Sequence, residues 1–112
     1  MSEKTTVLRQ LMAVIQDRKA NPPPRSYTTR LLAGGVSAIS DKILEEAREV
    51  TEAARESEAA GREHLIHETA DLIYHVCVLL GHQSIRWEDI ETELAARFGI
   101  CGLDEKAARE QQ

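Results

Sequence analysis

Aromatic residues are scarce in this chain, which has one Phe, one Trp and two Tyr among 112 residues. A domain of this length has a large surface for its volume, and few large rings are available to fill a core. We therefore expect part of the apolar surface to be buried between subunits. The length suits one domain, and we predict a single helical domain over residues 1–99, followed by a polar C-terminal tail over residues 100–112.

Cysteines and long apolar runs are also sparse. Cys77 and Cys101 have no CxxC spacing, so we expect free thiols that serve as small hydrophobic residues. The chain has no apolar run of about 18 residues and no signal-like N-terminal stretch. We therefore expect no membrane association and a cytoplasmic location.

An excess of positive charge is missing as well, because 14 Lys and Arg stand against 19 Asp and Glu and the formal net charge is -5. A nucleic-acid-binding domain needs a clustered basic surface to engage phosphates. Nucleic acid is therefore not an expected partner. A small polyanionic substrate would have to be bound by local cations.

The apolar pattern predicts an all-α fold, a bundle of about four to five helices. Apolar residues recur at helical spacing, and no segment alternates with a period of two for long enough to form a strand. The predicted long helices cover about residues 5–19, 36 or 40 to 58, 62–82 and 87–98.

Prolines, glycines and hydroxyl residues mark the connections between these helices. Three prolines at 22–24 cannot continue a helix. The hydroxyl cluster at 26–29 offers helix caps before a short helix that Gly34-Gly35 closes, and Gly99 is the expected stop of the last helix. Ser40 or Asp41 is the expected N-cap of the second long helix. Gly61 is its expected stop, and the short turn there should make the two long helices antiparallel neighbours.

Acidic residues fall where these two helices should face the core. Glu46 lies within the apolar stripe of the first, and Glu68 borders the apolar face of the second. Each is followed three positions later by another acid, Glu49 and Asp71. Such pairs share a helix face, with roughly 4.5 Å of axial rise between members. The stripe that contains Glu46 consists of Ile39, Ile43, Ala47, Val50 and Ala54.

Four facing carboxylates would repel one another strongly unless a cation lay among them, and oxygen ligands are those that Mg²⁺ or Mn²⁺ prefers. The alternative is a solvated acidic face neutralised by basic neighbours such as Lys42. His75 has the helical i, i+4 spacing from Asp71, but a lone His is more often a satisfied polar side chain. His67 is predicted to point elsewhere, and zinc is not expected, because no cysteine joins the cluster.

Four stretches resemble the phosphoribosyl-ATP pyrophosphatase family, within the all-α nucleoside triphosphate pyrophosphatase (MazG-like) superfamily. The resemblance covers about residues 5–99 and implies an all-α enzyme that forms homodimers or larger assemblies. The stretches are SYTTRLL at 26–32, DKILEEAREV at 41–50, HETADLIYH at 67–75 and WEDI at 87–90.

The resemblance also implies roles for individual residues. The implied Mg²⁺ ligands are Glu46, Glu49, Glu68 and Asp71. Glu45 or Glu49 would accept a proton from the attacking water. The implied phosphate-binding residue is Lys42. Our mechanistic hypothesis adds Arg25 or Arg30 as a further substrate-binding cation. It also adds Tyr27 and Thr28 as contacts of ribose or phosphate, with capping and packing as equal alternatives. Leu44 stands where the family usually has Gly, which removes support for a close backbone approach there.

The reaction implied is hydrolysis of phosphoribosyl-ATP to phosphoribosyl-AMP and pyrophosphate, the second step of histidine biosynthesis. Two other functions stay open. One is a house-cleaning pyrophosphatase of the same superfamily that acts on dUTP or a damaged nucleotide. The other is a non-catalytic helical assembly module. A partnership in trans with the next enzyme of the pathway, a cyclohydrolase, is a further alternative.

Overall fold

The computed structural model describes residues 6–56 and 58–99, and in these residues it contains four helices and no strand. This confirms the predicted all-α class. The helices are α1 (Val7–Ala20), α2 (Tyr27–Ala54), α3 (Glu58–His82) and α4 (Trp87–Phe98). The predicted tail over residues 100–112, together with Cys101, lies outside the described residues.

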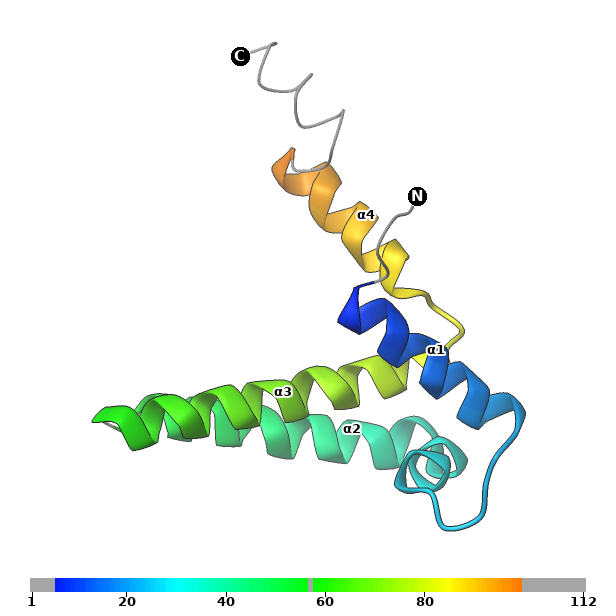
Figure 1. The fold of residues 1–112 in the computed structure, drawn as a ribbon, viewed down its shortest axis with the longest axis horizontal. Helices are drawn as coiled ribbons and strands as arrows, with labels where there is room; N and C mark the ends of the chain where they lie inside the picture. Colours follow the sequence, from blue (N-terminus) through cyan, green and yellow to red (C-terminus); the bar gives the residue numbers. More distant parts are fainter. Residues whose placement is uncertain (1–5, 57, 100–112) are drawn as a thin grey trace.

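Helices α2 and α3 lie side by side as a long antiparallel hairpin (Figure 1). Helix α1 packs across one end of this hairpin, and α4 contacts α1 and extends away from it. The core lies where α1, α2 and α3 meet. Its buried members are Met12, Ile15, Leu31, Ile39, Cys77 and Val78.

Local sequence explains most helix ends. The hydroxyl of Thr6 accepts a hydrogen bond from the Arg9 amide at 3.3 Å, and that of Ser26 accepts one from the Thr29 amide at 3.1 Å. These bonds satisfy amides that have no partner within the helix. Gly99 ends α4 in the left-handed conformation, with φ 65°. Within the predicted cluster of capping hydroxyls, Ser26 is the residue that caps α2, and the predicted stop at Gly99 is confirmed.

Gly35 introduces a sharp change of direction within α2. Its φ of 75° and ψ of -167° are non-helical and belong to a region that side chains with a Cβ rarely adopt. The predicted short helix thus ends at Gly35, and the long helix continues directly from it. Ser40 and Asp41 lie inside α2, so the prediction that either caps a helix was wrong. We call residues 27–34, which precede the break, the arm of α2.

The turn of the hairpin differs from the prediction. Helix α2 ends at Ala54 and α3 begins at Glu58, so Gly61 does not stop a helix but lies in the first turns of α3. It is buried there, and a Cβ on it would lie 2.9 Å from the backbone carbonyl of Glu56. This glycine therefore allows close approach of the turn.

The buried edge of α2 also shifts near its end. Ala53 is buried and Ala54 is exposed, so the predicted place of Ala54 in the core-facing stripe was wrong. A core-facing stripe predicted with a constant rotation per residue accumulates error along a helix as long as α2. The packing of α3 against α2 determines which of the two adjacent alanines is buried.

Large apolar side chains remain exposed on the surface. Val7, Leu44 and Phe98 have exposed fractions of 76, 69 and 67%. None of the helices in the described residues has the length and apolarity needed to cross a membrane. Cys77 is a buried free thiol, as predicted.

A candidate site for a divalent metal and phosphate

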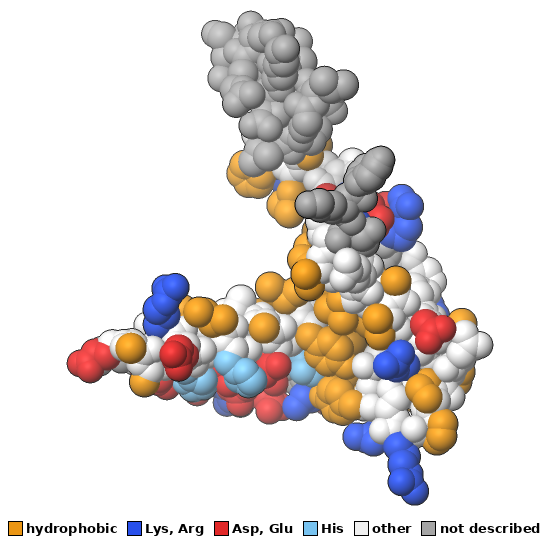
Figure 2. All heavy atoms as spheres, in the orientation of Figure 1, with side chains coloured by type: hydrophobic (Ala, Val, Ile, Leu, Met, Phe, Trp, Pro, Cys, Tyr) orange, Lys and Arg blue, Asp and Glu red, His pale blue; other side chains and the backbone are white. Residues whose placement is uncertain are grey.

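The carboxylates of the two acidic pairs lie at the interface of α2 and α3. Ligand atoms of Glu45, Glu46 and Glu49 lie within 4.8 Å of one another, and so do those of His67, Glu68 and Asp71. Glu46 is only 6% exposed, and its side chain lies against that of Glu68. We call Glu46, Glu49, Glu68 and Asp71 the carboxylate cluster. Figure 2 shows acidic and histidine side chains adjoining along the hairpin.

Burial makes the charge on Glu46 unfavourable. Loss of water raises the pKa of Glu46 to about 7, with further contributions from the contact with Glu68 and the charges of Glu49 and Asp71. Among the described residues, Glu46 Oε1 and Glu68 Oε1 are buried and have no hydrogen-bond partner. Buried acceptors without a partner are costly. A cation is one kind of partner that such oxygens can take.

Glu68 behaves in the opposite way. Burial raises its pKa, but its contacts with Glu46, Glu49 and His64 outweigh that effect, and the pKa ends below its usual value. In the metal-free protein, Glu46 therefore holds the proton more strongly and Glu68 carries the charge. His64 supports this arrangement, because its two ring nitrogens lie 2.9 Å from Glu56 and 3.2 Å from Glu68.

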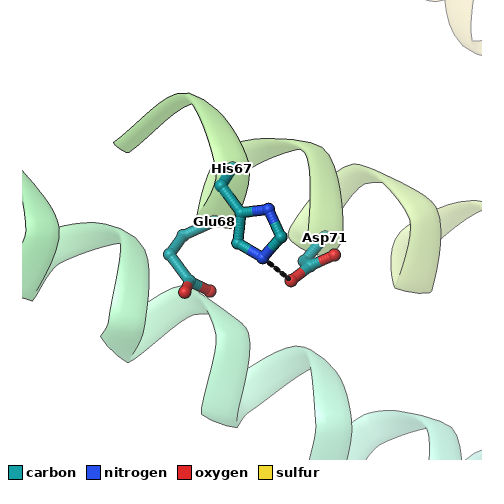
Figure 3. A group of neighbouring side chains, drawn as sticks. All are labelled: His67, Glu68 and Asp71. Carbon is teal, nitrogen blue, oxygen red and sulfur yellow. Dashed lines mark ion pairs between the residues drawn. The ribbon is translucent and has the colours of Figure 1, made fainter. Parts of the chain in front are cut away.

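His67 belongs to this site, and the prediction that it points elsewhere was wrong. Its Nε2 lies 3.4 Å from Asp71 Oδ2, and both residues lie beside Glu68, whose carboxylate points toward α2 (Figure 3). The sequence signal was present in the i, i+4 spacing of His67 and Asp71. The same spacing joins His64 to Glu68.

Lys42 lies at the α2 side of the cluster. Its ammonium contacts Glu45 Oε1 at 3.3 Å, and this hydrogen bond raises the pKa of Lys42. The lysine is therefore charged at neutral pH. Both side chains are partly exposed, so they can exchange partners with a ligand in solution.

The arm of α2 is attached to α3 beside the cluster. Tyr27 Oη lies 2.9 Å from Nε2 of His75, and the hydroxyls of Thr28 and Tyr74 form a second hydrogen bond. We call these four residues the arm contact. Tyr27 is 41% exposed and near enough to Lys42, Glu45 and Glu46 for their charges to affect its pKa. The bend at Gly35 thus brings the start of α2 back to the acidic residues of its middle.

His75 is buried, with 5% exposure, and both ring nitrogens have partners. Its Nδ1 donates to the backbone carbonyl of Asp71 at 2.8 Å, and its Nε2 faces Tyr27. No lone pair is left for a metal. The structure therefore assigns His75 to the arm contact.

The two arginines predicted to bind substrate, Arg30 and Arg25, lie in different surroundings. The guanidinium of Arg30 lies 5.8 Å from the centre of the Tyr27 ring. Arg25 lies in the turn before α2 with φ 70° and is exposed. It is not part of the contacts that join the arm to the cluster.

The donor set fits a hard divalent cation. It consists of carboxylate oxygens from two helices, two of them buried without a partner, and oxygen ligands of this kind are preferred by Mg²⁺. Lys42 adds a positive charge close to Glu45 and Glu46.

Comparison with known proteins agrees with this geometry. A family model described as Phosphoribosyl-ATP pyrophosphohydrolase matches residues 8–98. This chain belongs to the phosphoribosyl-ATP pyrophosphohydrolase family. The predicted resemblance is confirmed, and membership of this family makes the chain a hydrolase and not a non-catalytic assembly module.

Curated relatives from several bacteria support the assignment to the phosphoribosyl-ATP pyrophosphohydrolase family. A Phosphoribosyl-ATP pyrophosphatase of Rhodopirellula baltica is 48% identical over 109 residues, which cover 97% of this chain and 91% of the relative. The protein of the same name from Geotalea daltonii is 44% identical, with 94% and 96% coverage. That from Geobacter sulfurreducens is 42% identical, with 99% and 100% coverage.

Proposed function

We propose that this protein hydrolyses phosphoribosyl-ATP to phosphoribosyl-AMP and pyrophosphate, with Mg²⁺ as the required ion, in histidine biosynthesis. The observation that carries the proposal is the contact between Glu46 and Glu68, each of which has one buried oxygen without a hydrogen-bond partner, in a chain of this family.

Glu46, Glu49, Glu68 and Asp71 would hold the ion, and Mn²⁺ would suit the same oxygen ligands. When bound, the ion supplies neutralisation of phosphate charge and a lower pKa for nearby water. Its binding would also supply partners to the two buried oxygens.

The residues of the chain carry the remaining steps. Lys42 and Arg30 bind phosphate oxygens, which a protein of net charge -5 must meet with local cations. One bond forms between the water oxygen and the α-phosphorus, and the bond from that phosphorus to the bridging oxygen breaks. Its electron pair leaves with pyrophosphate. Glu45 or Glu49 accepts the water proton.

The proposal includes a homodimer in the cytoplasm. Exposed Leu44 and Ile66, on α2 and α3, are apolar surface that a second copy would cover. Sedimentation of the wild type tests this part, and a monomer at enzyme-assay concentrations would contradict it.

Hydrolysis of phosphoribosyl-ATP by the wild type, with and without Mg²⁺, tests the function directly. Glu49→Gln and Asp71→Asn should each lower kcat about 100-fold or more. The matched control is Glu52→Gln, the same change at an exposed position nearly one turn along α2, which should retain activity. Full activity in folded Glu49→Gln and Asp71→Asn proteins would refute the assigned site. Faster hydrolysis of dUTP than of phosphoribosyl-ATP would refute the substrate.

A further inference from the structure

The hydroxyl of Tyr27 occupies an unusual position, with one side on the buried His75 ring and the other toward the candidate site. Tyr27 is partly exposed, whereas His75 is almost fully covered. The phenol is thus fixed on its inner side, and its outer side is available to a ligand.

The direction of each hydrogen bond follows from the partner of the His75 Nδ1 atom. That partner is the backbone carbonyl of Asp71, at 2.8 Å, and a carbonyl oxygen has no proton to give. Nδ1 must therefore carry the hydrogen. In the neutral ring, which is the less costly form to bury, Nε2 then has a bare lone pair.

Tyr27 must supply the hydrogen of its contact with Nε2, which is 2.9 Å long. A phenol has one hydrogen, and the contact with His75 uses it. Only lone pairs of the Tyr27 oxygen remain on the outer side. Since a phosphate oxygen presents lone pairs too, the two oxygens would repel each other.

We propose that the Tyr27 oxygen acts as a hydrogen-bond acceptor for a sugar hydroxyl of the substrate, and that His75 is the positioning residue that imposes this direction. The inference rests on the proposed function. A sugar is the expected donor because Tyr27 lies beside Lys42, Glu45 and Glu46, where the α-phosphate would bind, and the sugar is attached to that phosphate. Lys42 and Arg30 remain the phosphate ligands.

Two features of the structure support this assignment. Burial raises the pKa of Tyr27 despite the nearby Lys42 charge, so the phenol keeps the hydrogen that it gives to His75. The second hydrogen bond of the arm contact, between Thr28 and Tyr74, holds the same backbone in place. It therefore offers a matched control for the loss of one hydroxyl.

The test compares Tyr27→Phe with Tyr74→Phe, using phosphoribosyl-ATP as substrate and inorganic tripolyphosphate as a sugar-free inhibitor. Tyr27→Phe should raise KM for the substrate about three- to tenfold, the cost of one neutral hydrogen bond, and leave the tripolyphosphate inhibition constant unchanged. Tyr74→Phe should change neither KM for the substrate nor the tripolyphosphate inhibition constant. An equal rise in KM and in the inhibition constant for Tyr27→Phe would show a phosphate contact and overturn the proposal. An unchanged KM, or equal effects in both variants, would show a structural anchor only.

The tautomer is tested separately by NMR of the protein labelled with ¹⁵N-histidine, with His75→Gln used to assign the His75 signals. A protonated Nδ1 and a bare Nε2 are expected. A proton on Nε2 in the resting protein would overturn the proposal, whether or not the substrate is hydrolysed. A wild type that does not cleave phosphoribosyl-ATP would instead refute the proposed function, so the two failures are distinct.

Discussion

The arm contact and the carboxylate cluster lie next to each other on the same helix pair, but their buried polar groups differ. In the arm contact, His75 has a partner for each ring nitrogen, and Thr28 and Tyr74 satisfy each other. In the carboxylate cluster, Glu46 and Glu68 each leave one buried oxygen without a partner among the described residues. Polar groups that are fully hydrogen-bonded hold the surrounding structure in one geometry. Buried oxygens without a partner destabilise the protein until a ligand binds them. The two regions should therefore respond to substitution in opposite ways.

The largest effect is expected from Glu46→Gln. Activity should fall about 100-fold or more, because charge that would hold the cation is lost, while the metal-free protein becomes more stable, because repulsion with Glu49 and Asp71 is removed. Paired measurements of kcat and of thermal unfolding without metal check this. A Glu46→Gln protein with both a lower kcat and a lower unfolding temperature would contradict this assignment, because loss of a purely structural residue has that effect. Glu63→Gln, on the exposed side of α3, is the control.

The stability of the metal-free protein should depend on the protonation of Glu46. The pKa of Glu46 in the folded state is about 7, above its ordinary value of 4.5, so the folded state binds the proton more tightly than the unfolded state. Stability should therefore fall by a few kcal/mol as pH rises from 4.5 to 7. Urea unfolding across this window, for wild type and Glu46→Gln, measures the difference. Parallel curves for the two proteins would contradict the assignment.

Mg²⁺ should raise the unfolding temperature of the wild type, since an ion that binds only the folded state stabilises it. The expected gain is about 2.7 kcal/mol at 100 times the dissociation constant. Tyr74→Phe should retain this gain, because the arm contact does not hold the ion. Glu68→Gln should lose most of it. A loss of equal size in both variants would mean that the two regions are not separable.

Gly35→Ala should destabilise the protein by about 1–3 kcal/mol, because a Cβ disfavours the φ of this residue. The nearest atom outside its chain neighbours is His82 Nε2, 4.0 Å from an added Cβ, so the cost comes from the backbone and not from a clash. KM should rise as the arm loses its place beside the cluster. Chemical unfolding and kinetics check this, and exposed Val36→Ala should change neither by much. An unchanged KM would show that the arm is not needed for binding.

The smallest effect is expected from Thr28→Val, which removes the hydroxyl that contacts Tyr74. A loss of about 1 kcal/mol in stability is typical for one hydrogen bond whose partner keeps access to water. Unlike Glu46→Gln, it should not stabilise the protein at any pH. A stabilised Thr28→Val protein in chemical unfolding would contradict a satisfied arm contact.

Much of the fold could be predicted because its signals are local. Apolar spacing identifies each helix, and Ser26 and Gly99 mark ends through their own side chain or backbone freedom. The end of α2 and the start of α3 were less predictable, because Gly61 is compatible with both a helix stop and a close approach. The position of the Glu56 backbone, close to Gly61, shows that this glycine allows a close approach and does not end a helix.

For the candidate site, sequence determined which side chains can share a helix face. The i, i+3 and i, i+4 periods are properties of a single helix, so the pairs Glu46 with Glu49 and Glu68 with Asp71 follow from spacing alone. Tertiary structure decided which oxygens lose water, which histidine meets the acids, and where the arm of α2 lies. Those outcomes depend on the register of α2 against α3 and on the bend at Gly35. Burial is set by residues far apart in the chain, which a local period does not specify.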